Sequence, residues 1–288
     1  MIDFCIITVT YNNSKYIDYL IECVNNSVQS STFHVFILDN CSKDVDIIEE
    51  ICVKNSHVTL IKSDTNVGFC KGNNVALKSA LKLEPKAILF LNPDLFLTDL
   101  WLDKTKTILN DNSIGILSGP LLHFDFEFKK PTGLIDSLGI NVTRYGKWFD
   151  VSQGRPFFKN SEPAFPKAIC GALMLIPREV IDILLKTDGY VFNEKFFMYK
   201  EDVDLSLRIQ KLGYKVLVHP DLEVFHCRGW KKDRSAMPFM AKKLSAINDV
   251  RVALRHRLIN LPFALLKLFY VYTAELPLRE FYTSIKKL

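Results

Sequence analysis

The sequence lacks the cysteine spacing that holds zinc ions and disulfide frameworks. Its seven cysteines are scattered, with no Cys-x-x-Cys pair among them. An odd number without framework spacing is typical of a reducing compartment and argues against structural zinc. The chain also contains neither Gly-x-Gly-x-x-Gly nor a Walker sequence. Neither a Rossmann dinucleotide site nor a P-loop is therefore supported.

Long apolar runs are absent as well. The stretch 258–272 is mostly apolar, but Pro262 and Lys267 interrupt it. A membrane span needs about 20 consecutive apolar residues, so we do not expect this stretch to cross a bilayer. No basic segment precedes the apolar run Phe4–Val9. This run therefore predicts a first strand rather than a secretory signal.

Charge is unevenly distributed along the chain. The 288 residues are 48% hydrophobic, enough for a large core, and carry a net charge of +5. Residues 228–288 contain 13 basic and 4 acidic residues, a net charge of +9, so the remaining residues carry −4. A basic segment on a mildly acidic body predicts an anionic partner surface. Nucleic acid is a poor fit, because the basic residues lie among apolar and aromatic ones.

The same C-terminal segment has an amphipathic helical pattern. Arg251 and Arg255 lie on a different face from a stripe of six apolar residues. The stripe consists of Leu244, Ile247, Val250, Leu254, Leu258 and Leu261. A basic, aromatic-rich amphipathic segment is suited to the interface of an anionic bilayer. We therefore expect association with a membrane surface, with packing against the domain or a homodimer contact as the alternatives.

The first 118 residues alternate strand and helix patterns. This alternation predicts an α/β protein with a mostly parallel sheet and crossover helices. We expect strands at Phe4–Thr10, Val35–Leu38, Val58–Ile61 and Ala87–Leu91. We expect helices at Lys15–Gln29, Val45–Cys52 and Asn73–Leu83.

The second half of the chain is less regular. Residues 119–168 are rich in glycine and proline, which predicts irregular loops that shape an acceptor site. Strands are expected again at Ala172–Ile176, Lys215–Val218 and Leu222–His226. Between them, the helical pattern Asp202–Leu212 ends at Gly213, a suitable C-cap.

The turn Asn92-Pro93-Asp94 follows the apolar strand Ala87–Leu91. In open α/β sheets, ligands bind beyond the carboxyl ends of the strands. A carboxylate at this place can hold a divalent cation, which in turn grips a diphosphate. A plain Asn-Pro-Asp turn explains the same residues equally well.

Two other strand ends carry polar residues. At the end of the first strand, Tyr11 can stack on a base, while Thr10 and Asn12 supply hydrogen bonds. At the end of the second, Asp39 can accept a hydrogen bond from the N–H of a pyrimidine. Each of these segments also fits an ordinary turn.

A loop rich in glycine and asparagine, residues 66–74, precedes one of the expected helices. It reads Asn-Val-Gly-Phe-Cys-Lys-Gly-Asn-Asn. Glycines such as Gly68 allow the backbone to approach a ligand closely, and Lys71 can meet a phosphate. Asn66 and Asn73 add polar side chains to the same loop.

Three acidic residues, Glu201, Asp202 and Asp204, open a helix directly after the aromatic cluster 196–199. A helix N-terminus stabilises carboxylates, so capping is one explanation. The aromatic cluster can also partly desolvate Asp202, which could then serve as a general base. His226 follows the last expected strand; lone histidines are more often structural, but its position after the acidic segment favours a functional role.

Taken in order, these segments resemble the family 2 glycosyltransferases of the GT-A fold, and especially the rhamnosyltransferase-like branch of bacterial surface-polysaccharide synthesis. The resemblance covers about residues 1–230, and the ordered set is more specific than any single motif. The matching segments are Val-Thr-Tyr-Asn at 9–12, Leu-Asp-Asn-Cys-Ser at 38–42, the loop at 66–74, Leu-Phe-Leu-Asn-Pro-Asp at 89–94, Gly-Ala-Leu-Met-Leu-Ile at 171–176, Phe-Phe-Met-Tyr-Lys-Glu-Asp-Val-Asp-Leu at 196–205, and His226.

The resemblance implies a role for each matched residue. Asp202 would be the inverting base that takes the proton from an acceptor hydroxyl. Asp94, with His226, would bind Mg²⁺ or Mn²⁺; because Asn92 replaces the first acid of the family's Asp-x-Asp, we expect modest metal affinity. The donor-binding residues would be Thr10, Tyr11, Asn12 and Asp39 at the base, and Asn66, Gly68, Lys71, Asn73, Asn92 and Asp94 near the ribose and diphosphate.

The resemblance therefore implies a GT-A glycosyltransferase domain at residues 1–230 and a basic amphipathic helical tail at residues 231–288. The expected reaction is inverting transfer of a sugar, with L-rhamnose from dTDP-β-L-rhamnose as the specific hypothesis. The acceptor would be a hydroxyl of a lipid-linked oligosaccharide or polysaccharide, at the cytoplasmic face of the cell membrane.

Three alternatives remain open. One is a hexosyl or N-acetylhexosaminyl transferase that uses a UDP-sugar. Another is a sugar nucleotidyltransferase, although the Gly-rich basic loop expected after its first strand is replaced here by Tyr11-Asn12-Asn13. The third is a non-catalytic carbohydrate or membrane adaptor, against which the intact Asp94 and Asp202 argue.

Overall fold

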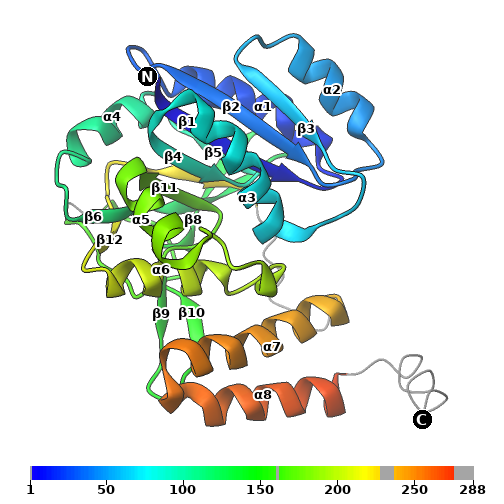
Figure 1. Cartoon of the computed structure of the whole chain (residues 1–288), viewed down its shortest axis with the longest axis vertical. Coiled ribbons are helices and arrows are strands. Elements are labelled where there is room, and N and C mark those ends of the chain that lie inside the picture. The colour runs from blue at the N-terminus through cyan, green and yellow to red at the C-terminus, as the bar shows by residue number, and fades with distance from the viewer. Residues whose placement is uncertain (1, 160–161, 228–236, 276–288) are drawn as a thin grey trace.

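The computed structural model describes residues 2–159, 162–227 and 237–275. Strands and helices alternate through the first half of the chain (Figure 1). The strands are β1 (Ile2–Thr10), β2 (Phe33–Asp39), β3 (Val58–Lys62), β4 (Pro85–Leu91), β5 (Leu95–Leu97), β6 (Ile114–Ser118), β7 (Leu121–Asp125), β8 (Lys130–Ser137), β9 (Ile140–Val142), β10 (Trp148–Asp150), β11 (Leu173–Pro177), β12 (Lys215–Val218) and β13 (Val224–His226). The α-helices are α1 (Ser14–Asn26), α2 (Val45–Val53), α3 (Gly68–Ala80), α4 (Trp101–Ile108), α5 (Arg178–Asp188), α6 (Glu201–Lys211), α7 (Phe239–His256) and α8 (Leu261–Ala274).

Seven strands form a mixed central sheet in the order β12-β6-β11-β4-β1-β2-β3. Within it, β11 runs antiparallel to both of its neighbours, β4 and β6, and the other pairs are parallel. The carboxyl ends of β1, β2 and β4 therefore meet at one edge, where Thr10 is paired with Asp39. The backbone N–H of Asn92, just beyond β4, donates to Ala172 O at 2.9 Å and joins this edge to the start of β11.

The strands of the sheet bury both of their faces. In β1, Cys5 and Ile7 enter a core shared with α3, α5 and α6, whereas Phe4 and Ile6 enter a core shared with α1, α2 and α4. A strand buried on both faces reads as a continuous apolar run. The run Phe4–Val9 was recognisable as a strand for this reason.

A second, four-stranded sheet has the order β5-β13-β7-β8. The pairing of β13 with β5 sets His226 opposite Leu95, immediately after Asp94. Asp136 belongs to β8, at the far edge of this sheet. A short β9–β10 hairpin extends from the sheet toward α7 and α8 (Figure 1).

The predicted α/β class and GT-A arrangement are confirmed, but some local predictions were wrong. Residues 119–168 contain β7, β8, β9 and β10 rather than irregular loops. Two of their glycines lie in the connections: Gly139 and Gly146, both with φ above +90°, are at the turns on either side of β9. Pro131 lies on β8, an edge strand, where a missing N–H is tolerated. The sequence patterns also missed α4, α5 and β6.

The C-terminal helices α7 and α8 lie side by side, joined by the short turn Leu258–Asn260 (Figure 1). The buried residues of α7 include Asn248 and Asp249, while Leu254 and Leu258 of the predicted apolar stripe are 57% and 66% exposed. The other four residues of the stripe are half-buried, so the stripe is only partly covered by the body of the protein. In the part of the chain that the structure describes, no helix combines the length and apolarity needed to span a bilayer.

Candidate active site

Two cavities adjoin at the carboxyl edge of the central sheet. The strand-end cavity, of about 450 Å³, is lined by Thr10, Tyr11, Asn66 and Gly68, among others. The carboxylate cavity, of about 360 Å³, is lined by Glu201, Asp202 and His226, among others. Five residues line both cavities and make them one cleft: Phe69, Asn92, Asp94, Met198 and Tyr199. The fold thus brings together most of the residues that the sequence selected.

His226 lies between two carboxylates. Its Nδ1 is 2.8 Å from Asp136 Oδ2, and its Nε2 is 3.5 Å from Asp94 Oδ2. Burial of the ring opposes its protonation, but hydrogen bonding to Asp136 and Asp94 outweighs this and raises the pKa of His226 to about 9. Asp136 therefore holds Nδ1 of the imidazole and leaves Nε2 directed at Asp94.

Asp202 is fixed in the first turn of α6. Its Oδ2 accepts a hydrogen bond from Gly171 N at 3.1 Å, and its Oδ1 accepts from Val203 N at 2.8 Å. A Cβ at position 171 would lie 3.1 Å from Asp202 Cβ, so a glycine allows this close approach. Beside it, burial and the Asp202 charge raise the pKa of Glu201 to about 8.

The segment 196–200 forms the common wall of the two cavities. Three of its residues, Phe197, Tyr199 and Lys200, have φ between +59° and +70°, a strained region for side chains other than glycine. The Asn248 amide of α7 donates to the backbone carbonyls of residues 196, 198 and 199 at 2.8–2.9 Å. Asn248 therefore holds the backbone that leads directly into Asp202.

The same segment packs on the Gly68 loop. Cys70 N donates to Phe197 O at 3.2 Å, and a Cβ at position 68 would lie 2.5 Å from the Phe197 ring. Asn40 anchors this loop from the other side, since its side chain bonds Val67 N and Gly68 O. Both cavities consequently depend on one interlocked group of loops.

Asp39 and Thr10 present buried polar atoms at the ends of their strands. Asp39 Oδ2 accepts from Ser42 N at 3.0 Å, as the turn explanation predicts. The other carboxylate oxygen, Oδ1, and Thr10 Oγ1 are both buried without a hydrogen-bond partner among the described residues. Buried polar atoms of this kind are uncommon, and a ligand with matching donors would satisfy them.

Four selected residues do not line the cleft: Asp39, which is buried at the end of β2, and Asn12, Lys71 and Asn73. Asn12 instead closes the turn after β1, where its Oδ1 accepts from Lys43 N at 2.9 Å. The expected loop at 66–74 is helical from Gly68 onward, which places Lys71 on the exposed surface of α3. Asn73 is buried in the same helix, and its amide donates to Phe69 O at 3.0 Å.

The sequence patterns missed Asp136 and Asn248. Asp136 lies in the glycine- and proline-rich region and meets its partner 90 residues later. Asn248 lies within the amphipathic helix, where a polar residue reads as solvent-exposed. Its only sequence signal is that Asn248 and Asp249 together interrupt the helical pattern with adjacent polar side chains.

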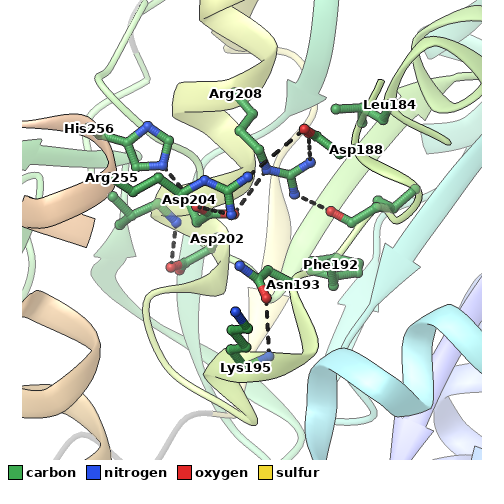
Figure 2. A network of polar contacts seen from close by, with 12 residues as sticks. Leu184, Asp188, Phe192, Asn193, Lys195, Asp202, Asp204, Arg208, Arg255 and His256 are labelled. Carbon is green, nitrogen blue, oxygen red and sulfur yellow. Dashed lines mark hydrogen bonds and ion pairs between the residues drawn. The ribbon is translucent and has the colours of Figure 1, made fainter. Parts of the chain in front are cut away.

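A buried ionic network joins α6 to α7 behind Asp202 (Figure 2). Asp204 contacts Arg208 Nε at 2.9 Å and His256 Nε2 at 2.8 Å, and Arg208 continues to Asp188 at 2.9 Å. Burial opposes ionisation of Asp204, yet His256 and Arg208 hold its pKa below the usual value. The helix that carries Asp202 is thus tied to the C-terminal helices by charge as well as by Asn248.

A metal ion would need ligands from more than the protein. Within residues 2–159, 162–227 and 237–275, no three histidine, cysteine or acidic side chains form a group able to hold one. Asp94 and His226 approach each other closely enough for two ligands of one ion. Asp136 bonds the other ring nitrogen of His226, as carboxylates commonly do to orient a histidine that binds a metal.

A mixed sheet with this cleft at its carboxyl edge is the architecture of GT-A glycosyltransferases, and comparison with known proteins agrees. The model of the Glycosyl transferase family 2 matches residues 5–166, more than half of the chain. The chain belongs to this family.

Two curated relatives have low sequence identity. The chain is 26% identical over 215 residues to the low-salt glycan biosynthesis hexosyltransferase Agl10 of Haloferax volcanii, covering 73% of this chain and 62% of that protein. It is 25% identical over 241 residues to the rhamnosyltransferase WbbL of Escherichia coli K12, covering 77% and 82% respectively. The chain thus spans less than two thirds of the length of Agl10.

Solved structures share the fold at lower identity. GalNAc-T7 with UDP, GalNAc and Mn²⁺ superposes with a TM-score of 0.64 at 16% identity, over 88% of this chain and 48% of that one. The mannosyltransferase PcManGT of Pyrobaculum calidifontis, with GDP-Man and Mn²⁺, gives 0.56 at 16% identity, over 95% and 72%. TarS of S. aureus with UDP gives 0.52 at 19% identity, over 92% and 69%.

Proposed function

We propose that this glycosyltransferase transfers a sugar with inversion from a nucleotide donor to a hydroxyl of a lipid-linked oligosaccharide or polysaccharide. L-Rhamnose from dTDP-β-L-rhamnose is the specific donor hypothesis, supported by the similarity to a protein named as a rhamnosyltransferase. The observation that carries the proposal is the single cleft that contains Asp94 and Asp202 together with the polar ends of β1 and β4.

Asp202 is the general base in this proposal. Its position in the first turn of α6 stabilises the carboxylate, and the hydrogen bonds from Gly171 and Val203 fix its orientation. As the acceptor oxygen attacks the anomeric carbon, the bond to the nucleoside diphosphate breaks and Asp202 takes the hydroxyl proton. The neutral form of Glu201 avoids a second negative charge beside it.

The strand-end cavity holds the nucleotide in this proposal. Tyr11, which is 47% exposed, offers an aromatic face, and the unpartnered oxygens of Thr10 and Asp39 face donors on the base or ribose. Asn66 and Gly68 line the path toward Asp94. The proposal assigns no contact to Asn12, Lys71 or Asn73.

Asp94 and His226 would hold a Mg²⁺ or Mn²⁺ ion, with His226 binding as the neutral imidazole after release of its Nε2 proton and with diphosphate and water oxygens as the remaining ligands. When bound, such an ion neutralises charge on the departing diphosphate. Asp136 would act as a positioning residue, because its bond to Nδ1 keeps Nε2 directed at Asp94. Two structural neighbours were solved with Mn²⁺, which supports a divalent cation.

Asp202→Asn tests the base. The variant keeps the size of the side chain but cannot accept the proton, so transfer should fall about 10²–10⁴-fold while nucleotide binding is retained. Release of nucleoside diphosphate and calorimetric titration of the nucleotide measure the two effects. Asp221→Asn, a change of an exposed acid, is the matched control. Full turnover by Asp202→Asn would refute this role.

Asp94→Ala tests the cation site. Titration of the nucleotide with and without Mn²⁺ should show that the variant loses the metal-dependent part of the affinity. Asp136→Asn should weaken Mn²⁺ binding by about 10–100-fold, the usual effect of losing a second-sphere partner. Unchanged Mn²⁺ affinity in both variants would contradict the assignment of Asp94 and His226.

A UDP-sugar is the second candidate donor. Agl10 is named as a hexosyltransferase, and TarS was solved with UDP and with UDP-GlcNAc. Screening dTDP-rhamnose against UDP-hexoses by ligand-observed NMR separates the two donors. Binding of UDP-hexoses alone would discard the rhamnose hypothesis and leave the reaction class intact.

The lipid-linked acceptor and peripheral membrane association rest on the C-terminal helices. Large apolar side chains of α8 are exposed, including Leu266 at 66% and Phe269 at 67%. The basic residues of the segment 228–288 would favour an anionic surface. Sedimentation with anionic vesicles, compared with neutral ones, tests this association, and analytical ultracentrifugation tests the alternative of a homodimer.

A further inference from the structure

A third cavity, of about 860 Å³, lies between α8 and the β9–β10 hairpin. We call it the α8 groove. Aromatic and aliphatic side chains make most of its walls: Tyr145 and Trp148 from the hairpin, and Phe263, Leu266, Phe269 and Tyr270 from α8. Tyr145 and Phe263 bring the two walls together, with their ring centroids 5.6 Å apart. Figure 1 shows the hairpin reaching toward the two C-terminal helices.

The α8 groove is continuous with the candidate active site. Lys200 and Ser245 line both the groove and the carboxylate cavity. Lys200 is also two residues before Asp202 in sequence. A molecule whose hydroxyl reaches Asp202 can therefore extend past Lys200 into the groove without leaving the protein surface.

Polar groups make the smaller part of the groove surface, and two of the polar lining residues, Lys200 and Ser245, lie where the groove meets the carboxylate cavity. Lys147 and Lys200 form no ion pair within the described residues, whereas Lys267 is paired with Asp249 at 2.5 Å. Most backbone groups of the α8 wall are bonded within the helix, apart from those of its last turn. An extended peptide would find few backbone partners here, whereas an apolar chain with one anionic end matches the lining.

We propose that the α8 groove binds the lipid part of the acceptor, an isoprenoid diphosphate, with the chain along α8 and the diphosphate near Lys147 and Lys200. This inference rests on the proposed function, since it concerns the acceptor of that reaction. It also implies that the sugar portion between the diphosphate and the reacting hydroxyl is short, because Lys200 lies beside the carboxylate cavity.

Farnesyl diphosphate is the test ligand. Calorimetric titration of the full chain is carried out with excess dTDP and UDP, which occupy the strand-end cavity and prevent the diphosphate from binding there. We expect farnesyl diphosphate to bind more tightly than farnesol, which lacks the anionic end, and than inorganic diphosphate, which lacks the chain. Equal binding of farnesyl diphosphate and inorganic diphosphate would overturn the proposal.

Leu266→Glu and Leu254→Glu form a matched pair of variants. Both leucines are exposed, at 66% and 57%, but only Leu266 lines the groove. Leu266→Glu should weaken farnesyl diphosphate binding by about tenfold or more, because a charge replaces apolar surface. Leu254→Glu should leave it unchanged. Lys147→Ala should weaken binding of farnesyl diphosphate but not of farnesol.

Three results would overturn the proposal. In the first, both leucine variants bind farnesyl diphosphate as the parent does. In the second, both lose binding equally, which would indicate a general membrane-facing surface. Leu266→Glu could also convert a dimer to a monomer in ultracentrifugation without changing lipid binding, which would make the groove a contact between copies. Failure of the proposed function is distinguishable, because Asp202→Asn would then leave turnover unchanged whatever the groove binds.

Discussion

Asn248→Asp should reduce catalysis although residue 248 does not touch the substrate cleft. The substitution keeps the shape of the side chain and its contact with Arg251 but removes the amide hydrogens. In the native protein, that amide donates to three backbone carbonyls of the segment 196–200, all at 2.8–2.9 Å. An amide nitrogen carries two hydrogens, so the three carbonyl oxygens share two donor hydrogens, which is equivalent to two hydrogen bonds.

The expected cost follows from what those bonds restrain. A neutral hydrogen bond contributes about 1 kcal/mol net, and a buried carbonyl left unpaired costs about 1–3 kcal/mol. Losing two shared bonds therefore costs about 2–6 kcal/mol. The strain of each non-glycine residue with positive φ is about 1–2 kcal/mol, and Phe197, Tyr199 and Lys200 all have it. Without Asn248, relaxing this strain displaces the segment.

Because this segment leads into Asp202 and packs on Gly68, both base and donor positions should shift. A loss of about 3 kcal/mol expressed in the transition state corresponds to roughly a 100-fold fall in kcat. Donor affinity should fall as well, since Phe197 O accepts the hydrogen bond from Cys70 N. Steady-state turnover and calorimetric donor titration, both well below the unfolding temperature, measure these effects.

His256→Ala is the matched control. It removes a buried contact between α6 and α7, from His256 Nε2 to Asp204 at 2.8 Å, without touching the segment 196–200. It should lower the unfolding temperature while largely preserving kcat of the folded protein. If Asn248→Asp loses no more activity than His256→Ala, or if its loss only follows the unfolded fraction, then Asn248 acts on stability alone and the reasoning is wrong.

Three further substitutions test other parts of the structure. Burial and the neighbouring acid raise the pKa of Glu201 from 4.5 to about 8 in the folded protein. Because the folded state resists ionisation of Glu201, the stability of the parent falls as the pH rises above 4.5. Glu201→Gln should therefore match the parent near pH 4.5 and be more stable at about pH 8 in urea unfolding. Although burial opposes it, hydrogen bonds from a backbone amide and two lysines lower the pKa of Asp3; the destabilisation caused by Asp3→Asn should therefore shrink as the pH falls below about 4. Gly68→Ala should weaken donor binding in calorimetry, because its Cβ meets the Phe197 ring at 2.5 Å, whereas Gly133→Ala, with similar φ and open space around it, should not.

The sequence predicted the part of the fold in which buried strands appear as continuous apolar runs. The strands β1, β2 and β4 are buried on both faces and appear as apolar runs, and their ends correctly located Thr10, Asp39 and Asp94. Helix α5 was missed although Val180, Ile181 and Leu184 are its buried residues at helical spacing. The strands within residues 119–168 were missed because glycine and proline dominate that region, and their positions at turns and on an edge strand become evident only from the pairing.

The site was predictable where a short segment carries its own chemistry, and unpredictable where distant segments meet. Asp202 follows an aromatic cluster in the same ten residues, so local sequence sufficed. Asp136 acquires its meaning only from the pairing of β7 with β8 and β13, which brings it to His226. Lys71 shows the opposite error: its neighbours in sequence suggested a phosphate loop, but the early start of α3 turned its side chain to the surface.

The C-terminal helices illustrate why an amphipathic pattern does not identify the buried face. In α7, the packed side includes Asn248, Asp249 and the small residue Ala246, while Leu254 of the apolar stripe is exposed. Asn248 is buried there because its amide donates to the backbone of the segment 196–200, and Asp249 because it pairs with Lys267. Leu254 is exposed outside the groove, whereas Leu266 and Phe269 of α8 line it. In our proposals the two helices therefore have separate roles: Asn248 of α7 positions the candidate base Asp202, and apolar side chains of α8 receive the lipid. For this reason we expect substitutions in the two helices to separate kcat from acceptor affinity.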